Sequence, residues 1–152
     1  MRPFKMTKID CSGQALVELA LVLLLLLFLV LGIFEFGRAM YIKNTLTHSA
    51  RAGAREAIVT PNLPPNTSDT GCTSTDKVFQ TTCENLYSGI EKDNVTILVQ
   101  VFSPNTTSPK ATIAAPGDRV KVTVTLSNYT PVVPKFIPVP TTLAGDTAMR
   151  YE

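Results

Sequence analysis

The sequence predicts an α+β protein, in which a long N-terminal α-helix that crosses a membrane precedes a small antiparallel β-sheet domain with a short helix. Three observations predict this fold class. Residues 15–34 are apolar or small except for Glu18, and about 20 such residues suffice to cross a bilayer. Residues 4–60 contain no proline, so one helix can run through them. Residues 95–102 and 120–127 alternate apolar and polar side chains, as half-buried strands do.

We expect one continuous helix from Gln14 to Ala57, about 66 Å long at 1.5 Å per residue. The hydrocarbon core of a bilayer is only about 30 Å thick. Residues 14–36 are therefore expected to span the membrane, while the later part stands in water or against protein. The expected organisation is a leader at residues 1–13, the long helix at 14–57, and a small extracytoplasmic α+β domain at 58–152.

The second half of this helix is amphipathic. Small residues four apart, such as Ser49 with Gly53 and Ala50 with Ala54, allow helix backbones to approach closely. This face either packs against another helix or covers the C-terminal domain of its own chain. Its members recur at helical spacing: Ala39, Ile42, Leu46, Ala50, Gly53 and Ala57.

The helix is predicted to end at Thr60-Pro61, because the residue before proline avoids helical backbone angles. Residues 60–74 are rich in Pro, Asn, Thr and Ser, which indicates a loop. A short helix is expected over residues 76–88, capped by Ser74 or Thr75.

The strands over 95–102 and 120–127 each place their β-branched residues on one face. Residues 115–118 (Ala-Pro-Gly-Asp) predict a turn between them. Residues 131–140 contain four prolines, so this segment is expected to be extended and outside any central strand position. Residues 143–151 are predicted to form a third strand.

The composition limits the function classes. The 152-residue chain has a net charge of +2, and its basic residues form no continuous run, which argues against nucleic-acid binding. The single histidine, His48, has no nucleophile or carboxylate placed by sequence to make it catalytic. We therefore expect no enzymatic activity, catalytic residue, metal site or cofactor.

Cysteine spacing gives an independent prediction. Of the three cysteines, removal of the leader would take away Cys11 and leave Cys72 and Cys83. A disulfide between them would close a short loop and contribute about 3 kcal/mol by the loop-entropy argument. Small exported domains often need such a cross-link, whereas the alternative is two free cytosolic thiols. Because the Lys and Arg counts on the two sides of the apolar segment are nearly equal, the cysteine pair favours an extracytoplasmic domain.

The junction before the apolar segment is the main candidate site. A small residue, Gly13, separates a polar leader from the helix and gives a peptidase access to the Gly13–Gln14 bond. Glu18 follows within the apolar segment, where a carboxylate is costly and usually functional. The alternative for Glu18 is an acid at the start of a helix, held in the lipid headgroups and favoured by the helix dipole.

Residues 13–57 resemble the N-terminal region of the TadE-like pseudopilins of the tight-adherence (Tad) pilus system. The matching stretches are residues 13–18 (GQALVE), 34–38 (FEFGR) and 45–55 (TLTHSARAGAR), and the tail at 148–152 (AMRYE) is also similar. The resemblance implies processing by a prepilin-type peptidase, a minor structural role in pilus assembly, and no enzymatic activity.

After cleavage, Gln14 would carry a new α-amine and Glu18 would be the fifth mature residue. A neighbouring subunit's amine could then pair with Glu18 and fix the register of helix packing. Glu35 and Arg38 are three residues apart, so they can pair at the outer edge of the membrane. They either contact another pilin or the assembly platform, or they serve as a membrane anchor with a weak surface ion pair.

The sequence thus predicts a minor pilin or pseudopilin that takes part in tight-adherence pilus assembly and surface adhesion. Its expected partners are other pilin subunits through the N-terminal helix, a prepilin-type peptidase, the pilus assembly platform and the membrane, with no nucleic acid. Its expected location is the bacterial inner membrane, as a single-pass protein with an extracytoplasmic C-terminal domain, and then the pilus or cell surface. The alternative is a single-pass membrane-anchored binding module that never enters a filament.

Overall fold

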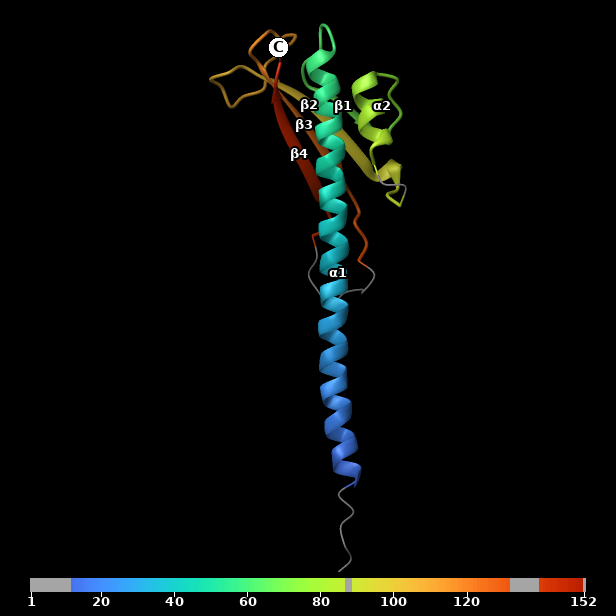
Figure 1. Ribbon diagram of the computed structural model, residues 1–152. Helices are drawn as coiled ribbons and strands as arrows, with labels where there is room; N and C mark the ends of the chain where they lie inside the picture. The colour runs from blue at the N-terminus through green and yellow to red at the C-terminus, as the bar shows by residue number, and fades with distance from the viewer. Residues whose placement is uncertain (1–11, 87–88, 132–139, 152) are drawn as a thin grey trace, which may run out of the picture.

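The computed structural model describes residues 12–86, 89–131 and 140–151. One long helix carries a small sheet domain, here called the head, along its C-terminal half, while its N-terminal half projects away from the head (Figure 1). The predicted α+β class is confirmed. The elements in chain order are α1 Ser12–Val59, β1 Thr67–Thr70, α2 Lys77–Glu84, a 3₁₀ turn Lys92–Asn94, β2 Val95–Phe102, β3 Arg119–Leu126 and β4 Leu143–Arg150.

Helix α1 has 48 residues and is about 72 Å long. It extends the predicted helix by two residues at each end. The predicted stop before Pro61 is confirmed, since α1 ends at Val59. Thr60 closes the last turn, because its backbone N–H and its hydroxyl both donate to the Glu56 carbonyl, at 3.1 and 2.8 Å.

The four strands form an antiparallel sheet in the order β1-β2-β3-β4. The alternation expected in β2 and β3 is confirmed, and partners such as Val99 and Val122 face each other across the two strands. The inward side chains of these strands are completely buried: Val95, Ile97, Val99, Val101, Val120, Val122 and Val124.

Helix α1 lies across this inner face of the sheet (Figure 1). Of the two interpretations for its amphipathic half, covering its own domain is confirmed for the face that contains Leu46, Ala50 and Ala57, which are fully buried. Gly145 of β4 faces the backbone of α1, where an added Cβ would lie 2.6 Å from the Leu46 carbonyl carbon. Gly53 similarly contacts Thr82 of α2. Small residues thus allow the close approach that their spacing predicted, but toward the chain's own head.

Two predictions about residues 60–88 are wrong. The segment predicted as a loop contains β1, which pairs with β2 through Thr67–Thr70. Its sequence, Thr-Ser-Asp-Thr, has no apolar alternation because it is an edge strand held by backbone hydrogen bonds, which leave little trace in side-chain pattern. Asp76, and neither Ser74 nor Thr75, occupies the N-cap position of α2, where its side chain forms no capping hydrogen bond. The Ser74 hydroxyl instead accepts the Asp76 N–H at 3.2 Å.

The predicted short helix is present but ends at Glu84, and the other predictions match closely. The turn at 115–118 is present, with the Asp118 N–H donating to the Ala115 carbonyl at 3.0 Å. The strand expected at 143–151 is β4, the fourth strand along the chain, because β1 precedes it. Most of the proline-rich segment at 131–140 lies outside the described residues, as do residues 87 and 88 of the predicted short helix.

Candidate membrane and assembly helix

Within the part of the chain that the structure describes, the most apolar stretch of α1 is left uncovered. By length and composition, α1 is the one helix among the described residues that could cross a membrane, and none of its most apolar stretch is buried. Its apolar side chains are exposed from Leu16, at 67%, to Phe34, at 61%, except that Leu31 is only partly exposed. An apolar surface of this extent requires lipid or another protein to cover it.

The predicted processing and assembly residues lie at the start of this exposed segment. Gly13 and Gln14 belong to the first turn of α1 and are exposed. A Cβ added at Gly13 would meet nothing within 4 Å. Glu18 is also exposed, one turn further on, and no described residue forms an ion pair with it. The roles of these residues in cleavage and assembly stay predictions.

Glu35 is the first residue of α1 that is buried among the described residues. Its side chain is only 2% exposed, and Oε1 accepts a hydrogen bond from the Tyr129 hydroxyl at 2.6 Å. Arg38 Nη1 lies 3.6 Å from the same oxygen. The structure therefore brings the predicted Glu35–Arg38 pair together with a buried carboxylate, which does not fit a weak surface pair. Whether the pair contacts another pilin or serves the membrane anchor stays a prediction.

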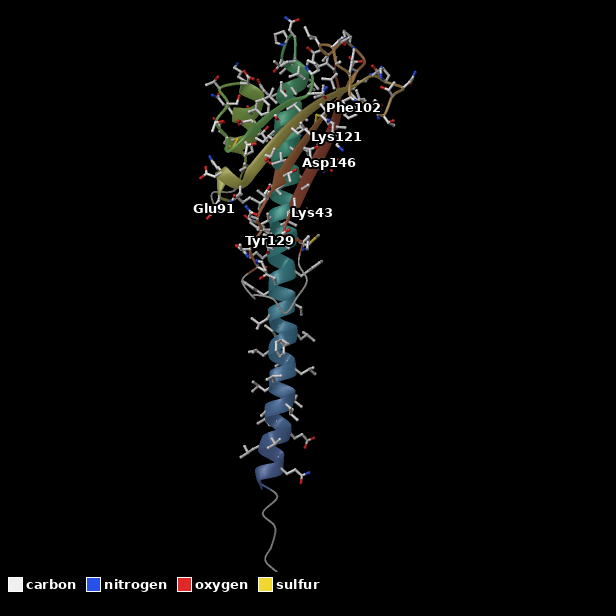
Figure 2. All side chains as sticks on the ribbon, turned by 180° about the vertical axis from the view of Figure 1, so that it is seen from behind. Lys43, Glu91, Phe102, Lys121, Tyr129 and Asp146 are labelled. Carbon is white, nitrogen blue, oxygen red and sulfur yellow. A yellow bond between two sulfur atoms is a disulfide. The ribbon has the colours of Figure 1, made fainter. Side chains whose placement is uncertain are left out.

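Arg38 also binds the head. Its Nη1 donates to the Thr130 carbonyl at 3.1 Å, and its guanidinium lies 5.2 Å from the centre of the Tyr129 ring, within the range of a cation–π contact. Figure 2 shows Tyr129 close to α1 at the lower end of the head. We call Glu35, Arg38, Tyr129 and Thr130 the junction cluster, because together they fasten the head to the helix where the exposed segment ends.

Sequence reasoning missed Tyr129, which follows β3. Asn128 adopts a left-handed backbone angle, φ 60°, which asparagine tolerates better than most residues, and this turns the chain after the strand. The Tyr129 N–H then donates to the Thr141 carbonyl at 2.8 Å. Burial first, and then the hydrogen bond to Glu35, raise the pKa of the Tyr129 phenol, so this group stays a neutral donor at physiological pH.

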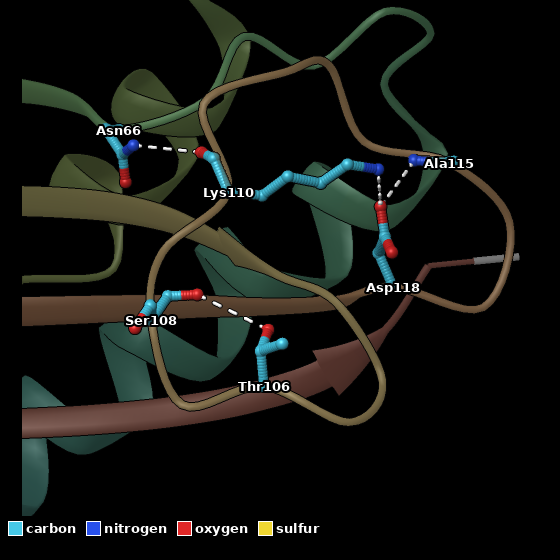
Figure 3. A network of polar contacts seen from close by, with 6 residues as sticks. All are labelled: Asn66, Thr106, Ser108, Lys110, Ala115 and Asp118. Carbon is cyan, nitrogen blue, oxygen red and sulfur yellow. Dashed lines mark hydrogen bonds and ion pairs between the residues drawn. The ribbon is translucent and has the colours of Figure 1, made fainter.

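A second polar network secures the far end of the head (Figure 3). Asp118 Oδ2 accepts hydrogen bonds from Lys110 Nζ and from the Ala115 N–H, both at 2.8 Å. The hydrogen bond from Lys110, followed by that from Ala115, lowers the pKa of Asp118. Asn66 Nδ2 donates to the Lys110 carbonyl at 3.0 Å, so the loop before β3 is held to the segment before β1.

The predicted disulfide between Cys72 and Cys83 is present. It ties the loop after β1 to α2, and Cys83 is part of the buried core. The neighbouring Asp69 is a feature that the sequence did not reveal. It points inward from β1, accepts a hydrogen bond from the Thr73 hydroxyl at 2.9 Å, and has a second buried carboxylate oxygen without a partner among the described residues.

A cavity of about 510 Å³ lies at the end of α1 farthest from the N-terminus. Val59, Leu63 and Phe79 supply apolar walls, and the carboxylates of Glu56 and Asp76 also line it. No group of three or more metal-ligating side chains occurs within the described part of the chain.

These features define a class of protein: a helix able to anchor in a membrane that continues without a break into a small antiparallel sheet domain. Within that class, residues 13–55 match the family model of TadE-like protein. The match confirms the resemblance seen in the N-terminal sequence and associates that region with the Tad pilus system. It covers the exposed apolar segment, the junction residues of α1 and the buried helix face, and it ends before the sheet. No curated protein and no solved structure matches the chain.

Proposed function

We propose that this protein is a minor pilin or pseudopilin, a structural subunit without enzymatic activity that acts in tight-adherence pilus assembly and surface adhesion. One observation carries the proposal. Among the described residues, the head buries one face of α1 from Glu35 onward, whereas the segment before it is apolar except for Glu18 and almost entirely exposed. A subunit of this shape can sit in a bilayer and later exchange lipid for the helices of other subunits. The TadE-like match over residues 13–55 supports the same function.

Processing at the Gly13–Gln14 bond by a prepilin-type peptidase is part of the proposal. The bond lies in the exposed first turn of α1, and the ends of helices open most easily. Cleavage would remove the leader at residues 1–13 and leave the α-amine of Gln14 at the tip of the helix.

Glu18 would then fix the register of helix packing. Leucine against leucine gives little register information, whereas a carboxylate that pairs with a neighbour's α-amine is left unpaired by any slip. Removing one partner of a buried ion pair costs about 3–5 kcal/mol. The exposure of Glu18 in the single chain leaves it free to meet such a partner.

The junction cluster gives Glu35 and Arg38 a role in the same assembly. Because Glu35 is buried against Tyr129, we infer that this pair holds the head in a fixed orientation to the helix and does not itself contact another pilin. A fixed orientation allows packing of the helices to place the heads in register.

The proposed location is the bacterial inner membrane, with the head extracytoplasmic, followed by the pilus or cell surface. The disulfide supports an oxidising compartment for the head. The proposed partners are other pilin subunits, the prepilin-type peptidase and the pilus assembly platform.

One observation favours a second candidate, a membrane-anchored binding module that does not enter a filament. The 510 Å³ cavity at the far end of α1 has the size of a small-molecule or side-chain pocket. Both candidates use α1 as a membrane anchor. They differ in whether this helix stays in the membrane or packs into a filament.

Glu18→Ala in the native host separates them. The change makes the helix more apolar, so membrane insertion and cleavage at the Gly13–Gln14 bond should be near normal. Surface pili should become fewer or shorter. Glu84→Ala, which removes the same charge from an exposed position at the end of α2, is the matched control. Wild-type pili with normal levels of the mutant protein would contradict the assembly role. Intact mass should place the mature N-terminus at Gln14, and a chain that starts at residue 1 or 2, or is cut near Phe34, would contradict the processing.

A further inference from the structure

Two arginines face each other at one end of the open sheet surface. Arg119 begins β3 and Arg150 ends β4, and they are direct register partners. Both are exposed, and like charges directly opposite on neighbouring strands repel each other. Arg119 Nη2 donates to the Thr106 carbonyl at 3.0 Å, but no carboxylate of the described residues forms an ion pair with either arginine.

The neighbouring positions on β3 and β4 show that the unpaired positive charge is confined to the two arginines. Lys121, two residues along β3, forms an ion pair with Asp146 of β4 at 3.0 Å, and Figure 2 shows these two side chains together. The positive charge that remains on this surface is therefore concentrated at Arg119 and Arg150.

A groove of about 260 Å³ adjoins the arginines. Phe102, Thr107 and Ala148 line it together with Arg119 and Lys121. Guanidinium groups bind carboxylates through paired N–H donors. A polypeptide turn that carries carboxylates would neutralise the Arg119–Arg150 repulsion and fill the groove.

The chain itself carries such a turn at the opposite end of β2. Glu91 and Asp93 are exposed and form no ion pair within the described part of the chain. Glu91 Oε2 accepts a hydrogen bond from Asn94 Nδ2 at 2.9 Å, which holds the turn closed, and Lys92 between them leaves a net charge of −1. Figure 2 shows Glu91 at the end of the head nearer the bare helix and Phe102 at the opposite end. The eight residues of β2 between them span about 25 Å.

We infer that the acidic turn of a second copy of this chain, residues 91–94, docks on the Arg119–Arg150 pair in a head-to-tail contact. The two surfaces are complementary in charge and lie at opposite ends of one head. Such a contact uses different surfaces on the two partners, so it can continue from copy to copy in an open array.

This contact rests on the proposed function. With parallel helices, the second copy is displaced along α1 by about the length of the head. A displacement of about 25 Å would draw most of a 30 Å apolar segment out of the bilayer. The contact therefore belongs to copies packed in a filament and not to copies at equal depth in the membrane.

Cysteine cross-linking in the native host tests the contact. One plasmid-borne copy carries Lys92→Cys in the acidic turn, and the other carries Thr107→Cys at the groove, so both arginines and both carboxylates remain. After mild oxidation, the material sheared from the cell surface (the sheared fraction) is compared between cells that carry both variants and cells that carry one. It should contain about tenfold more cross-linked dimer when both variants are present than with either variant alone. The wild-type chain gives the background from its native cysteines.

Charge reversal supplies the second arm. Arg150→Glu in the Thr107→Cys copy should lower the dimer yield about tenfold, and Glu91→Arg in the Lys92→Cys copy should restore it. Lys77→Glu on α2 makes the same change of charge away from both surfaces and should have no effect.

Equal dimer yields from mixed and single-variant cells, or yields insensitive to Arg150→Glu, would overturn the inference. Cross-links that join this chain to a different protein would also overturn it. If the protein reaches the sheared fraction but gives no mixed dimer, the inference fails while the proposed function stands. If the protein never leaves the membrane fraction, both fail.

Discussion

Replacement of Gly145 by alanine should separate β4 from α1. The added Cβ would lie 2.6 Å from the Leu46 carbonyl carbon, about 0.8 Å short of the 3.4 Å at which ordinary contact begins. Backbone atoms of a regular helix cannot rotate away as a side chain can, so the strand and the helix must move apart. A gap of 0.5–1 Å forfeits a quarter to a half of the dispersion energy of each contact.

The expected loss of stability is about 3 kcal/mol, at the upper end of the range for overpacking. For a head of this size, that corresponds to a fall in Tm of roughly 12–24 °C. Thermal unfolding of the full chain in detergent can be followed by near-ultraviolet circular dichroism, since Tyr129 and Tyr151 are buried in the head. Ala144→Val, on the exposed face of the same strand, should leave Tm nearly unchanged. A Gly145→Ala protein with the wild-type Tm would refute the close approach of β4 to Leu46.

Three further predictions concern the head. Replacing Cys72 and Cys83 by alanine should lower the free energy of unfolding by about 3 kcal/mol in denaturant titrations, and unchanged stability would contradict a structural cross-link. Tyr129→Phe should cost about 1.5–3 kcal/mol, since it removes a hydrogen bond to a buried carboxylate; in a double-mutant cycle with Glu35→Gln, additive losses would contradict the coupling. Because the pKa of Asp118 is lowered in the folded state, its contribution is complete above the unfolded value near 3.9 and disappears as pH falls through the folded pKa. Asp118→Asn should therefore flatten the loss of stability between about pH 5 and pH 2, and an identical acid profile would show that Asp118 does not contribute.

The long helix and the two central strands were predictable because each is indicated by the local pattern of apolar and polar residues. The apolar run, the absence of proline before Pro61 and the alternation in β2 and β3 need no knowledge of distant residues. The disulfide between Cys72 and Cys83 was also predictable by counting, since the expected removal of the leader would leave two cysteines a short distance apart. The start of the helix and the resemblance to TadE-like proteins lie in the same contiguous segment, residues 13–55.

Strand β1 and the capping of α2 were not predictable in this way. β1 is polar and short, and it exists because β2 offers it an edge. Which of three consecutive polar residues caps α2 depends on where the chain leaves the disulfide loop. Both outcomes depend on contacts that form only after the sheet has assembled.

The sequence by itself determined that a long apolar helix precedes a small α+β domain, because hydrophobic periodicity is a local property. Only the tertiary structure decided what the second half of the helix does. Gly53, one of the small residues whose spacing suggested close packing, lies against Thr82 of α2 in the chain's own head, and Gly145 of β4 approaches the helix backbone at Leu46. Glu35 is buried under Tyr129, 94 residues away along the chain. Spacing along a helix specifies which residues share a face, but which partner covers that face depends on the packing of segments far apart in the sequence.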